Sequence, residues 1–593
     1  MQIIPDLRPA RLACFLVVIA IAVVLQGAEC PAARAQADTG LTHPADSAAV
    51  QIRMRIGEGR QPHLRWPDFP HYQVEMEALY APGGYQPIWI ENGVPRRQAG
   101  EVIEILRQAE TRGLPVEEFD VSYLEDGWRR LASGTPMSGS DLGDLDVATS
   151  LLLMRHISDV HSGRINPGTL SHGLDVAPKK YDLAAAIRRG LAEDRLSLVV
   201  EAAEPQLPQY RALKAALIRY RALAQTPHRA PLPVKAKLRP GDHYAAARDL
   251  DQLLRMLGDL GSPAGPDESA STASGARSRG DPAAAPRTGL VYGGELVVGI
   301  RRFQERHGLI PDGIIGPATW KHLNQPLSRR VRQIELALER LRWLPDTESA
   351  PLVIVNIPSF RLYVFDSIAP GASPALQMSV VVGKAGLSGT PVFADRIRYV
   401  EFSPYWYPPS SIIKDEIVPG IKRDSNYLNS HDMELVPGTS DESKALETTP
   451  ENLKRLRTGR VWVRQRPGPR NSLGLVKFVF PNSHDIYLHD TPSRSLFARE
   501  RRDFSHGCIR VQDPKALAEF LLRDQPEWTR EAIEKAMQAG SPRRVNLKVP
   551  VPIYILYATA VSRPDGAVLF YDDLYGQDQE LDRALLEGEP FPR

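Results

Sequence analysis

The chain has 593 residues, with 73 Lys and Arg against 71 Asp and Glu, so its formal charge at neutral pH is +2. A hydrophobic share of 42% and a charged share of 24% are ordinary for globular proteins, which excludes a wholly disordered chain and a multi-spanning membrane protein. The near balance of charge argues against a dedicated nucleic-acid binder, and the length predicts about three or four domains.

Residues 1–37 have the pattern of a secretory signal peptide. Arg8 and Arg11 precede an unbroken apolar run over 12–25, and small residues at 35–37 supply an A-x-A cleavage site. The apolar run is shorter than the roughly 20 residues that a membrane-spanning helix needs. We therefore expect export from the cytoplasm, and both cleavage of the signal and its retention as a membrane anchor remain open.

Cleavage would leave one cysteine in the exported chain. Cys14 and Cys30 fall inside the signal, so that Cys508 remains alone. A single thiol outside the cytoplasm has no partner for an internal disulfide and is open to oxidation. Its presence suggests a chemical role.

The first half of the exported chain has a helical pattern. After a polar lead over 38–60, which we expect to be flexible, we predict an all-α scaffold domain over 61–236 without catalytic residues. Its apolar residues recur at three- and four-residue spacing, which predicts helices over 100–112, 144–160, 183–191 and 210–224. His156 and His161 are interpreted as packing or surface residues rather than metal ligands.

A second, small helical unit is predicted over 237–327. Its expected helices cover 245–258, 295–307 and 316–323. The segment 262–289 between the first two is rich in Ser, Ala, Gly and Pro, and we expect it to be a disordered insertion. An amphipathic linker helix follows within 328–350, and we expect its arginines to lie on a solvated face.

From residue 351 the periodicity changes to that of strands. Short β-rich runs bounded by Pro, Gly and Asn predict a mainly β domain over 351–545, with strands at 353–357, 362–365, 378–382, 397–402, 461–464, 475–480 and 485–488. A polar insertion at 410–460 is expected to cap this domain. The C-terminal extension, 546–593, is expected to add a β pair (553–560 with 567–570) and a short helix that pack on the scaffold or the β domain. The predicted fold class is multidomain α+β.

The segment 505–510 carries the strongest chemical signal. It contains Ser-His-Gly-Cys-Ile-Arg, and His489 lies 19 residues before Cys508. A thiol becomes nucleophilic as the thiolate, and a nearby imidazole is the usual means of removing its proton. Gly507 allows neighbouring N–H groups to turn toward a developing oxyanion, and the planar fork of Arg510 suits a carboxylate.

Cys508 has two other interpretations. Zinc binding by His484, His489, His506 and Cys508 would use the ligand types that zinc prefers, but His506-x-Cys508 is a tight spacing and no C-x-x-C accompanies it. An inert core thiol is disfavoured because Ser, His and Gly make a poor apolar pocket. Nucleophilic catalysis without a metal or another cofactor is the leading interpretation.

The Ser-His-Gly-Cys-Ile-Arg segment after an upstream histidine resembles the catalytic domain of the L,D-transpeptidases, thiol enzymes of the bacterial cell wall. Further matching words are Val-Asn-Ile-Pro at 355–358, Val-Gly-Lys at 382–384, Thr-Pro-Val-Phe at 390–393, Ser-Pro-Tyr-Trp at 403–406, Asn-Ser-Leu-Gly at 471–474, Lys-Phe at 477–478 and Leu-His-Asp-Thr-Pro at 488–492. The order Phe-Gln (303–304), His-Gly-Leu (307–309), Pro-Asp-Gly (311–313), Gly-Pro-Ala-Thr (316–319) and Leu-Asn (323–324) resembles a three-helix peptidoglycan-binding domain. Together the domains resemble the long, multidomain subgroup with a capped catalytic domain.

The resemblance implies a role for each matching residue. These implied roles are nucleophile for Cys508, general base for His489, loop support for His506 and Ser505, oxyanion donors from Gly507 and Cys508, and substrate binding by Arg510, Tyr487, Trp406 and Asp490. For Tyr487 and Trp406 packing against the sheet is an equally open interpretation. Asp503 adds a charge beside the nucleophile loop, which Arg501 or Arg502 would have to neutralise.

The resemblance also implies a function: a periplasmic enzyme that forms 3→3 peptidoglycan cross-links through a thioester on Cys508. Its partners would be a tetrapeptide donor and a diamino-acid acceptor stem, with a cell-wall lipoprotein as another possible acceptor. Two alternatives stay open, an L,D-carboxypeptidase that trims stem peptides and a non-catalytic peptidoglycan-binding protein. The small helical unit either binds glycan or merely builds a tight turn.

Overall fold

The computed structural model of the protein describes residues 44–170, 174, 179–226, 230–261, 291–346, 350–367, 369, 372–386 and 388–588. The expected signal peptide and the expected disordered insertion at 262–289 lie outside these residues. No helix in the described part combines the length and the apolar character that crossing a membrane requires.

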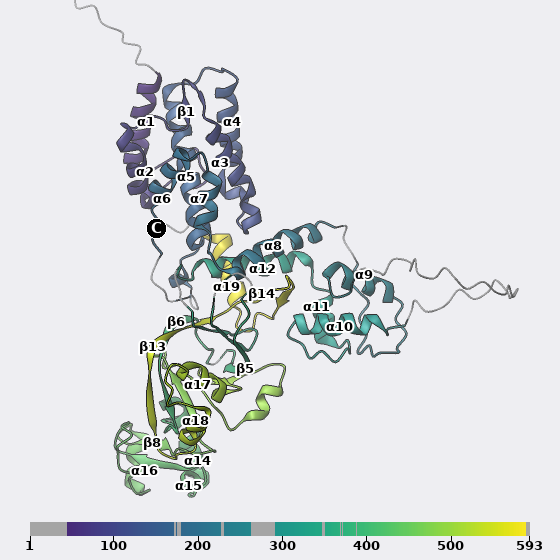
Figure 1. Cartoon of the computed structure of the whole chain (residues 1–593), viewed down its shortest axis with the longest axis vertical. Helices are drawn as coiled ribbons and strands as arrows, with labels where there is room; N and C mark the ends of the chain where they lie inside the picture. The colour runs from purple at the N-terminus through teal and green to yellow at the C-terminus, as the bar shows by residue number, and fades with distance from the viewer. Residues whose placement is uncertain are drawn as a thin grey trace, which may run out of the picture. The chain divides into compact units, whose positions relative to one another are not determined.

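The N-terminal domain is a helical bundle built around one central helix (Figure 1). Its helices are α1 (Pro44–Glu58), α2 (Gln73–Tyr80), α3 (Arg97–Arg107), α4 (Val121–Ala132), α5 (Gly139–Ser162), α6 (Leu183–Ala192) and α7 (Leu196–Ala203). A capping box between Ser138 and Asp141 begins α5. Nearly every later residue of α5 is buried, because five other helices of the bundle pack around it.

The flexible lead expected over 38–60 is wrong for 44–58, which form α1. Ile52 and Ile56 of this helix are buried in the bundle core, and Arg55 pairs with Asp144 of α5 at 2.8 Å. The polar composition of the segment obscured its single apolar face. The histidines of α5 pack as expected: burial against Phe119 lowers the pKa of His156 to about 3.

The second unit has the three predicted helices, each within two residues of its expected bounds: α9 (Ala247–Leu257), α10 (Glu295–Arg306) and α11 (Pro317–Leu323). The buried Gln304 of α10 holds the turn before α11. Its amide donates to Ile314 O at 2.9 Å and accepts from Gly313 N at 2.9 Å. Gln304 and Gly313, which belong to the segments that resemble a peptidoglycan-binding domain, therefore build this turn.

Two further helices, α8 (Pro208–Ala224) and α12 (Leu327–Arg342), pack against each other, and α12 leads into the β domain. The expectation that the arginines of α12 are solvated is wrong for Arg330 and Arg342, which are buried. Arg342 pairs with Glu339 at 2.9 Å, and Glu339 also accepts a hydrogen bond from the Arg164 backbone N–H. The helix is covered on several sides, so its charges are satisfied internally.

The β domain contains a nine-stranded sheet in the order β11-β5-β12-β10-β9-β6-β13-β3-β4. The strands are β3 (Leu352–Asn356), β4 (Arg361–Phe365), β5 (Leu376–Gly383), β6 (Phe393–Phe402), β9 (Val476–Val479), β10 (Leu488–His489), β11 (Asp503–Ser505), β12 (Ile509–Val511) and β13 (Arg543–Leu556). A further pairing of β4 with β5 closes the sheet on itself. The helices α17 (Pro514–Leu522) and α18 (Arg530–Met537) complete its core.

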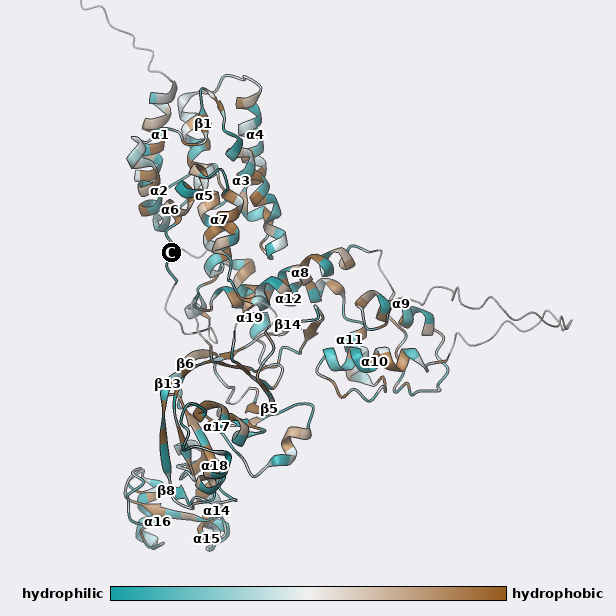
Figure 2. Cartoon of the chain, in the orientation of Figure 1, coloured by the Kyte–Doolittle hydropathy of each residue, from teal (hydrophilic) through white to brown (hydrophobic). Residues whose placement is uncertain are grey.

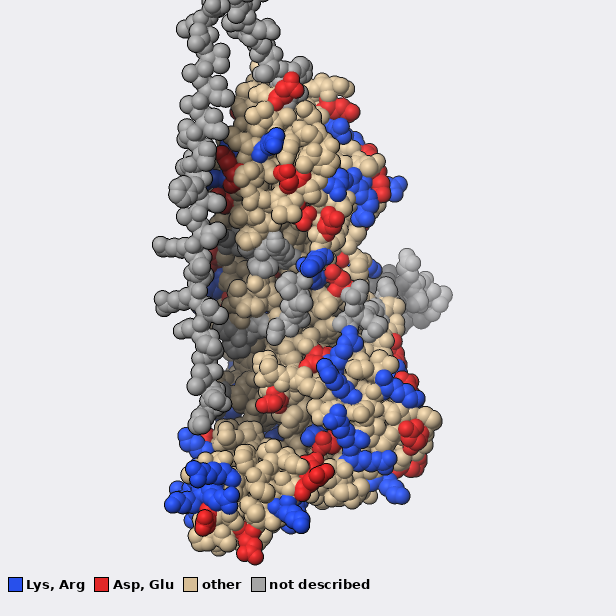
Figure 3. Space-filling model, turned by 90° about the vertical axis from the view of Figure 1, so that its left-hand side faces the viewer, with Lys and Arg blue, Asp and Glu red and all other residues tan. Residues whose placement is uncertain are grey.

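A cap is inserted between β6 and β9, and it has its own apolar cluster. It comprises α13 (Ser410–Ile412), a π-helical turn (Ile413–Ile417), α14 (Val418–Arg423), α15 (Tyr427–Ser430), β7 (Met433–Val436), α16 (Pro450–Arg457) and β8 (Trp462–Gln465). The strand predicted at 461–464 is β8, which pairs with β7 rather than with the main sheet. Figure 2 shows α16 as mostly hydrophilic and the strand β5 as largely hydrophobic. In Figure 3 acidic and basic side chains intermingle over the face shown.

The C-terminal segment differs from its prediction. The expected domain boundary at 545 falls inside β13, which lies between β6 and β3 in the main sheet. The β pair is formed by β14 (Ala560–Ser562) and β15 (Val568–Phe570), and α19 (Gln577–Glu587) follows. The apolar run over 551–556 predicts a buried strand, but it does not show which strands lie on either side of it.

Candidate active site

Cys508 lies on the short loop between β11 and β12, and four neighbours fix the loop's shape. Gly507 has φ +122°, a region that favours glycine, and an added Cβ would lie 3.1 Å from Ile486. The Ser505 hydroxyl accepts from Gly507 N at 3.2 Å and donates to Cys508 O. On the other side, the Thr390 hydroxyl donates to Gly507 O at 2.7 Å.

His489 ends β10, the parallel neighbour of β12. The register pairs Leu488 with Ile509 and His489 with Arg510. Because paired residues point to the same face and side chains alternate along each strand, this register puts Tyr487, His489 and Arg510 on one face. Cys508 directly precedes β12, opposite Tyr487, and belongs to the same face. The structure thus groups four of the predicted residues.

Burial keeps the thiol in its neutral form. Cys508 Sγ lies 3.6 Å from the Asp485 carbonyl oxygen, and the Tyr487 hydroxyl is its other polar neighbour. Loss of solvent raises the pKa of the Cys508 thiol above its ordinary value, against the hydrogen bonds from Tyr487 and the charge of Arg510, which lower it. The thiol therefore needs a base when it reacts.

The His489 ring is buried and oriented by the backbone. Its Nδ1 lies 2.6 Å from the Asp490 carbonyl oxygen, and because a carbonyl can only accept, Nδ1 carries the proton. In the neutral ring Nε2 is then the basic nitrogen. Burial, and secondly the charge of Arg510, lower the pKa of His489 to about 3, so the ring is neutral at physiological pH.

Arg510 brings an uncompensated positive charge to this face. Its Nε is buried without a hydrogen-bond partner among the described residues, and burial lowers the pKa of the guanidinium, with Cys508 opposing that shift. A half-buried cation that has no paired carboxylate among the described residues is stabilised when a ligand supplies one. The side chain is therefore available to a substrate carboxylate.

His506 points away from this group, toward the cap. Its Nε2 lies 3.3 Å from Glu416 in the π-helical turn, and both side chains are more than half exposed. The imidazole thus links the nucleophile loop to the cap, while Ser505 holds the loop from within. The sequence analysis predicted a polar insertion here but not this contact.

Two predicted roles need correction, those of Gly507 and Asp490, whereas Trp406 has the packing contacts that were its alternative interpretation. Gly507 cannot offer its N–H to an oxyanion in this conformation, because that group already donates to Ser505. Asp490 is a structural residue rather than a substrate ligand: it is buried, accepts from Leu475 N at 2.9 Å and pairs with Arg494 at 3.2 Å. Trp406 lies at the base of the cap and packs against the cap cluster.

Other polar groups near the site are satisfied. Asp503 forms a bidentate pair with Arg501, at 2.6 and 2.8 Å, so its charge is neutralised and the pKa of its carboxyl is lowered. The histidines of the zinc interpretation do not converge, because His484 packs against Phe393 and His506 faces Glu416. Across the described ranges no group of three His, Cys, Asp or Glu side chains is placed to hold a metal.

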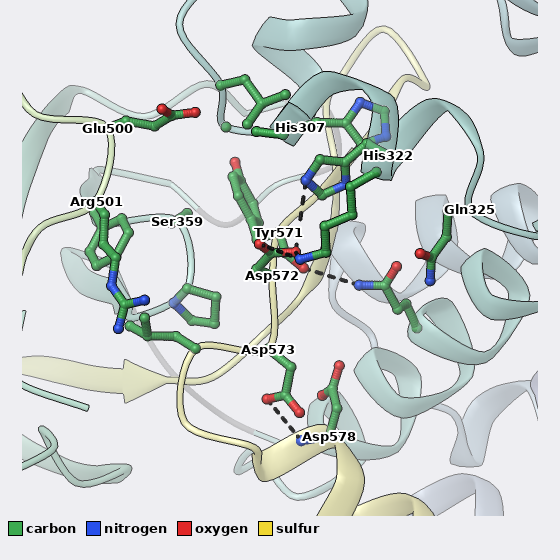
Figure 4. A pocket seen from close by; sticks show the side chains of 18 of the residues that line it. His307, His322, Gln325, Ser359, Glu500, Arg501, Tyr571, Asp572, Asp573 and Asp578 are labelled. Atoms are coloured by element: carbon green, nitrogen blue, oxygen red, sulfur yellow. Dashed lines mark hydrogen bonds and ion pairs between the residues drawn. The ribbon is translucent and has the colours of Figure 1, made fainter. Parts of the chain in front are cut away.

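A cavity of about 1530 Å³ lies elsewhere (Figure 4). Its walls come from α11, α12, the segment 497–502 and the segment 571–582, and neither Cys508 nor His489 lines it. Charged groups on its walls pair with one another, as Lys321 does with Asp572 at 2.9 Å. The cavity is therefore separate from the site around Cys508.

A closed sheet that carries a thiol, an imidazole and a guanidinium on one face of two neighbouring strands fits an enzyme of acyl transfer. In the comparisons, residues 350–551 match the family of L,D-transpeptidase catalytic domains. Residues 74–217 match a scaffold domain and residues 283–323 a "Putative peptidoglycan binding domain". Over 262 residues the chain is 29% identical to a protein of Haemophilus influenzae named "Putative L,D-transpeptidase". That match covers 44% of this chain and 51% of the relative, so it spans about half the length of each protein.

Proposed function

We propose that the protein is an exported L,D-transpeptidase that forms 3→3 peptidoglycan cross-links through an acyl-enzyme on Cys508. The observation that carries the proposal is the common face shared by Tyr487, His489, Cys508 and Arg510. The catalytic-domain and peptidoglycan-binding matches support peptidoglycan as the substrate. The signal-like residues 1–37 support a periplasmic location.

In the first step His489 Nε2 takes the thiol proton while Cys508 Sγ attacks the carbonyl carbon of the third residue of a donor stem. The Cys508 N–H stabilises the resulting oxyanion, and Arg510 holds a carboxylate of the stem. The tetrahedral intermediate collapses by breaking the bond to the terminal D-Ala, whose amine leaves with the proton from His489. A thioester on Cys508 remains.

In the second step the side-chain amine of an acceptor stem attacks the thioester. His489 accepts a proton from this amine, the new amide forms, and the proton returns to the departing sulfur. Attack by water in place of the amine would release a tripeptide, which is the carboxypeptidase alternative. A lipoprotein amine is a third acceptor with the same chemistry. The small helical unit would hold the enzyme on the wall.

The test is to incubate the purified chain with tetrapeptide muropeptides and to resolve proteins and products by mass. We expect an acyl-enzyme in the wild type, none in Cys508→Ala, and cross-linked dimers among the products. Tripeptides without dimers would favour the carboxypeptidase. Cross-linking that survives in Cys508→Ala would overturn the mechanism, and wall binding without any acylation would leave only the non-catalytic alternative.

The mechanism also predicts that carbapenem-type β-lactams acylate Cys508, because their strained ring resembles the scissile amide. Intact-mass measurement should show one adduct on the wild type and none on Cys508→Ala. Absence of an adduct on a protein whose thiol titrates as free would contradict an accessible nucleophile.

A further inference from the structure

The nucleophile loop rests on the connection between β5 and β6, with contacts near Gly383 at its start and at Thr390. Lys384 N donates to Ser505 O at 2.9 Å. The Thr390 hydroxyl accepts from Gly383 N at 2.8 Å and donates to Gly507 O at 2.7 Å. One buried hydroxyl therefore joins the start of this connection to the residue before the nucleophile.

The contact with Gly507 O has a geometric consequence for the nucleophile. A trans peptide is planar, with its carbonyl and its N–H pointing in opposite directions. By binding the Gly507 carbonyl, Thr390 fixes the Gly507–Cys508 peptide and aims the Cys508 N–H away from itself. Because the Gly507 N–H is engaged by Ser505, the Cys508 N–H is the loop donor left for an oxyanion.

Tyr575 closes the connection from outside the family match, which ends at residue 551. Its hydroxyl donates to Gly383 O at 2.5 Å and accepts from Thr390 N at 3.3 Å. Its ring also lies against Gly389, where an added Cβ would be 3.3 Å from Tyr575. Burial raises the pKa of Tyr575 to about 12, so the hydroxyl keeps the proton that it donates.

The C-terminal segment holds Tyr575 in place. The Tyr575 backbone N–H donates to the Tyr557 hydroxyl at 2.8 Å, and that hydroxyl donates to Asp573 at 2.6 Å. Asp573 also accepts from Asp578 N in the first turn of α19. The position of the Tyr575 hydroxyl is thus determined by a network separate from the catalytic loop.

We propose that Tyr575 is a positioning residue for acyl transfer: acting through Thr390, it holds the Gly507–Cys508 peptide so that the Cys508 N–H faces the developing oxyanion. The inference rests on the proposed function only in requiring that Cys508 be acylated. It assigns a part in the reaction to the C-terminal segment, beyond the matched catalytic domain.

The test compares two reactions of the same thiol in the full chain. Alkylation by iodoacetamide is a displacement without an oxyanion, whereas acylation by p-nitrophenyl acetate passes through one. Loss of one oxyanion donor costs about 10²–10³ in rate. Tyr575→Phe should misalign the Cys508 N–H rather than remove it, so the acylation rate should fall about tenfold. The alkylation rate and its pH profile should stay unchanged within about twofold.

Further variants separate positioning from general support. Thr390→Val should lower the ratio of the acylation rate to the alkylation rate more than Tyr575→Phe, and Thr390→Ser, which keeps the hydroxyl, should restore it. Tyr571→Phe is the matched control, because it changes the same segment and its hydroxyl makes no hydrogen bond within the described residues. Its ratio should equal that of the wild type.

Equal falls in both reactions, or unchanged acylation in Tyr575→Phe, would overturn the inference. Failure of the proposed function gives a different result, because neither reagent is a wall component. A wild type that reacts with the ester but forms no acyl-enzyme from stem peptides would refute the cell-wall role and leave the inference intact.

Discussion

At the scale of single residues, the site holds its acid and its base in their neutral forms. Burial raises the pKa of Cys508 and lowers that of His489 to about 3. The resting pair is therefore thiol and imidazole rather than thiolate and imidazolium. Arg510 contributes to this state by repelling a protonated His489. A substrate carboxylate bound to Arg510 would cancel that repulsion, so the base would strengthen when the donor stem arrives.

This reasoning predicts the effect of Arg510→Gln. Removing the cation should raise the pKa of His489, which NMR titration of the ring can follow. Because a hydrogen bond to a charged group contributes about 1.5–3 kcal/mol, kcat/KM for a stem peptide should fall about 10- to 100-fold. Arg494→Gln, which removes an arginine paired with Asp490, is the control and should leave the pKa of His489 in place. An unchanged His489 titration in Arg510→Gln would refute the argument.

At the scale of elements, the cap behaves as a small unit with a narrow base. Trp406 and Gln465 exchange two backbone hydrogen bonds, 3.1 and 2.8 Å long, at the base of the cap. The cap core includes Val461 and Val463. A deletion limited to 410–459 would therefore leave apolar residues of β8 exposed. Deletion of 407–464 removes the cap together with these residues.

We predict that replacing 407–464 by Asn-Gly preserves the sheet, because that pair forms a two-residue hairpin turn between paired strands. The variant should fold, keep a thiol that reacts with iodoacetamide, and show a raised KM for stem peptides because the wall over the nucleophile loop is gone. Glu416→Gln, which weakens only the contact with His506, should change KM far less, since exposed ion pairs contribute about 0–1 kcal/mol. Loss of soluble protein or an unchanged KM in the excision variant would argue against this function of the cap.

At the scale of the whole molecule, α12 and the C-terminal segment tie the helical and β parts together. Arg332 pairs with Asp582 at 2.7 Å and Arg340 with Asp578 at 2.5 Å. On another side of α12, Glu339 accepts from the backbone of Arg164 and Ile165. These buried and half-buried polar contacts fix orientation more than they add stability.

Buried histidines also make stability depend on pH. His156 has its pKa lowered to about 3 in the folded state, against about 6.5 when unfolded. Its contribution is fully present above pH 6.5 and falls by about 1.4 kcal/mol per pH unit as the unfolded chain takes up the proton. Asp146, whose pKa burial raises to about 6, acts in the opposite direction below that pH.

Comparing the wild type with His156→Leu isolates the contribution of His156 to the pH dependence of the free energy of unfolding. Between pH 6.5 and pH 5 the free energy of unfolding of the wild type should fall by about 2 kcal/mol relative to the variant. Urea titrations of both proteins at the two pH values measure the difference. Parallel pH dependences would show that His156 is not held neutral by burial.

Much of this organisation could be predicted from local pattern. The periodicity located the helices of the second unit and most strands of the main sheet, and the Ser-His-Gly-Cys-Ile-Arg segment with His489 identified the reacting groups. The polar helix α1 was not predicted, and the strands predicted at 461–464 and 553–560 could not be given their partners, because strand pairing joins segments that lie far apart in sequence. Thr390 was visible in a matching motif, but nothing local connected its hydroxyl to Gly507.

The sequence by itself determined which chemistry is available: a lone thiol, an upstream imidazole, a glycine where the loop must turn, and an arginine for a carboxylate. Only the tertiary structure decided how these groups are used. The parallel register of β10 and β12 sets their common face, and burial sets their protonation. Asp490 and the Gly507 N–H make structural contacts instead of the predicted substrate contacts, and Tyr575 contacts the connection that supports the loop. Strand pairing and packing bring these residues together, and their spacing along the chain does not predict it.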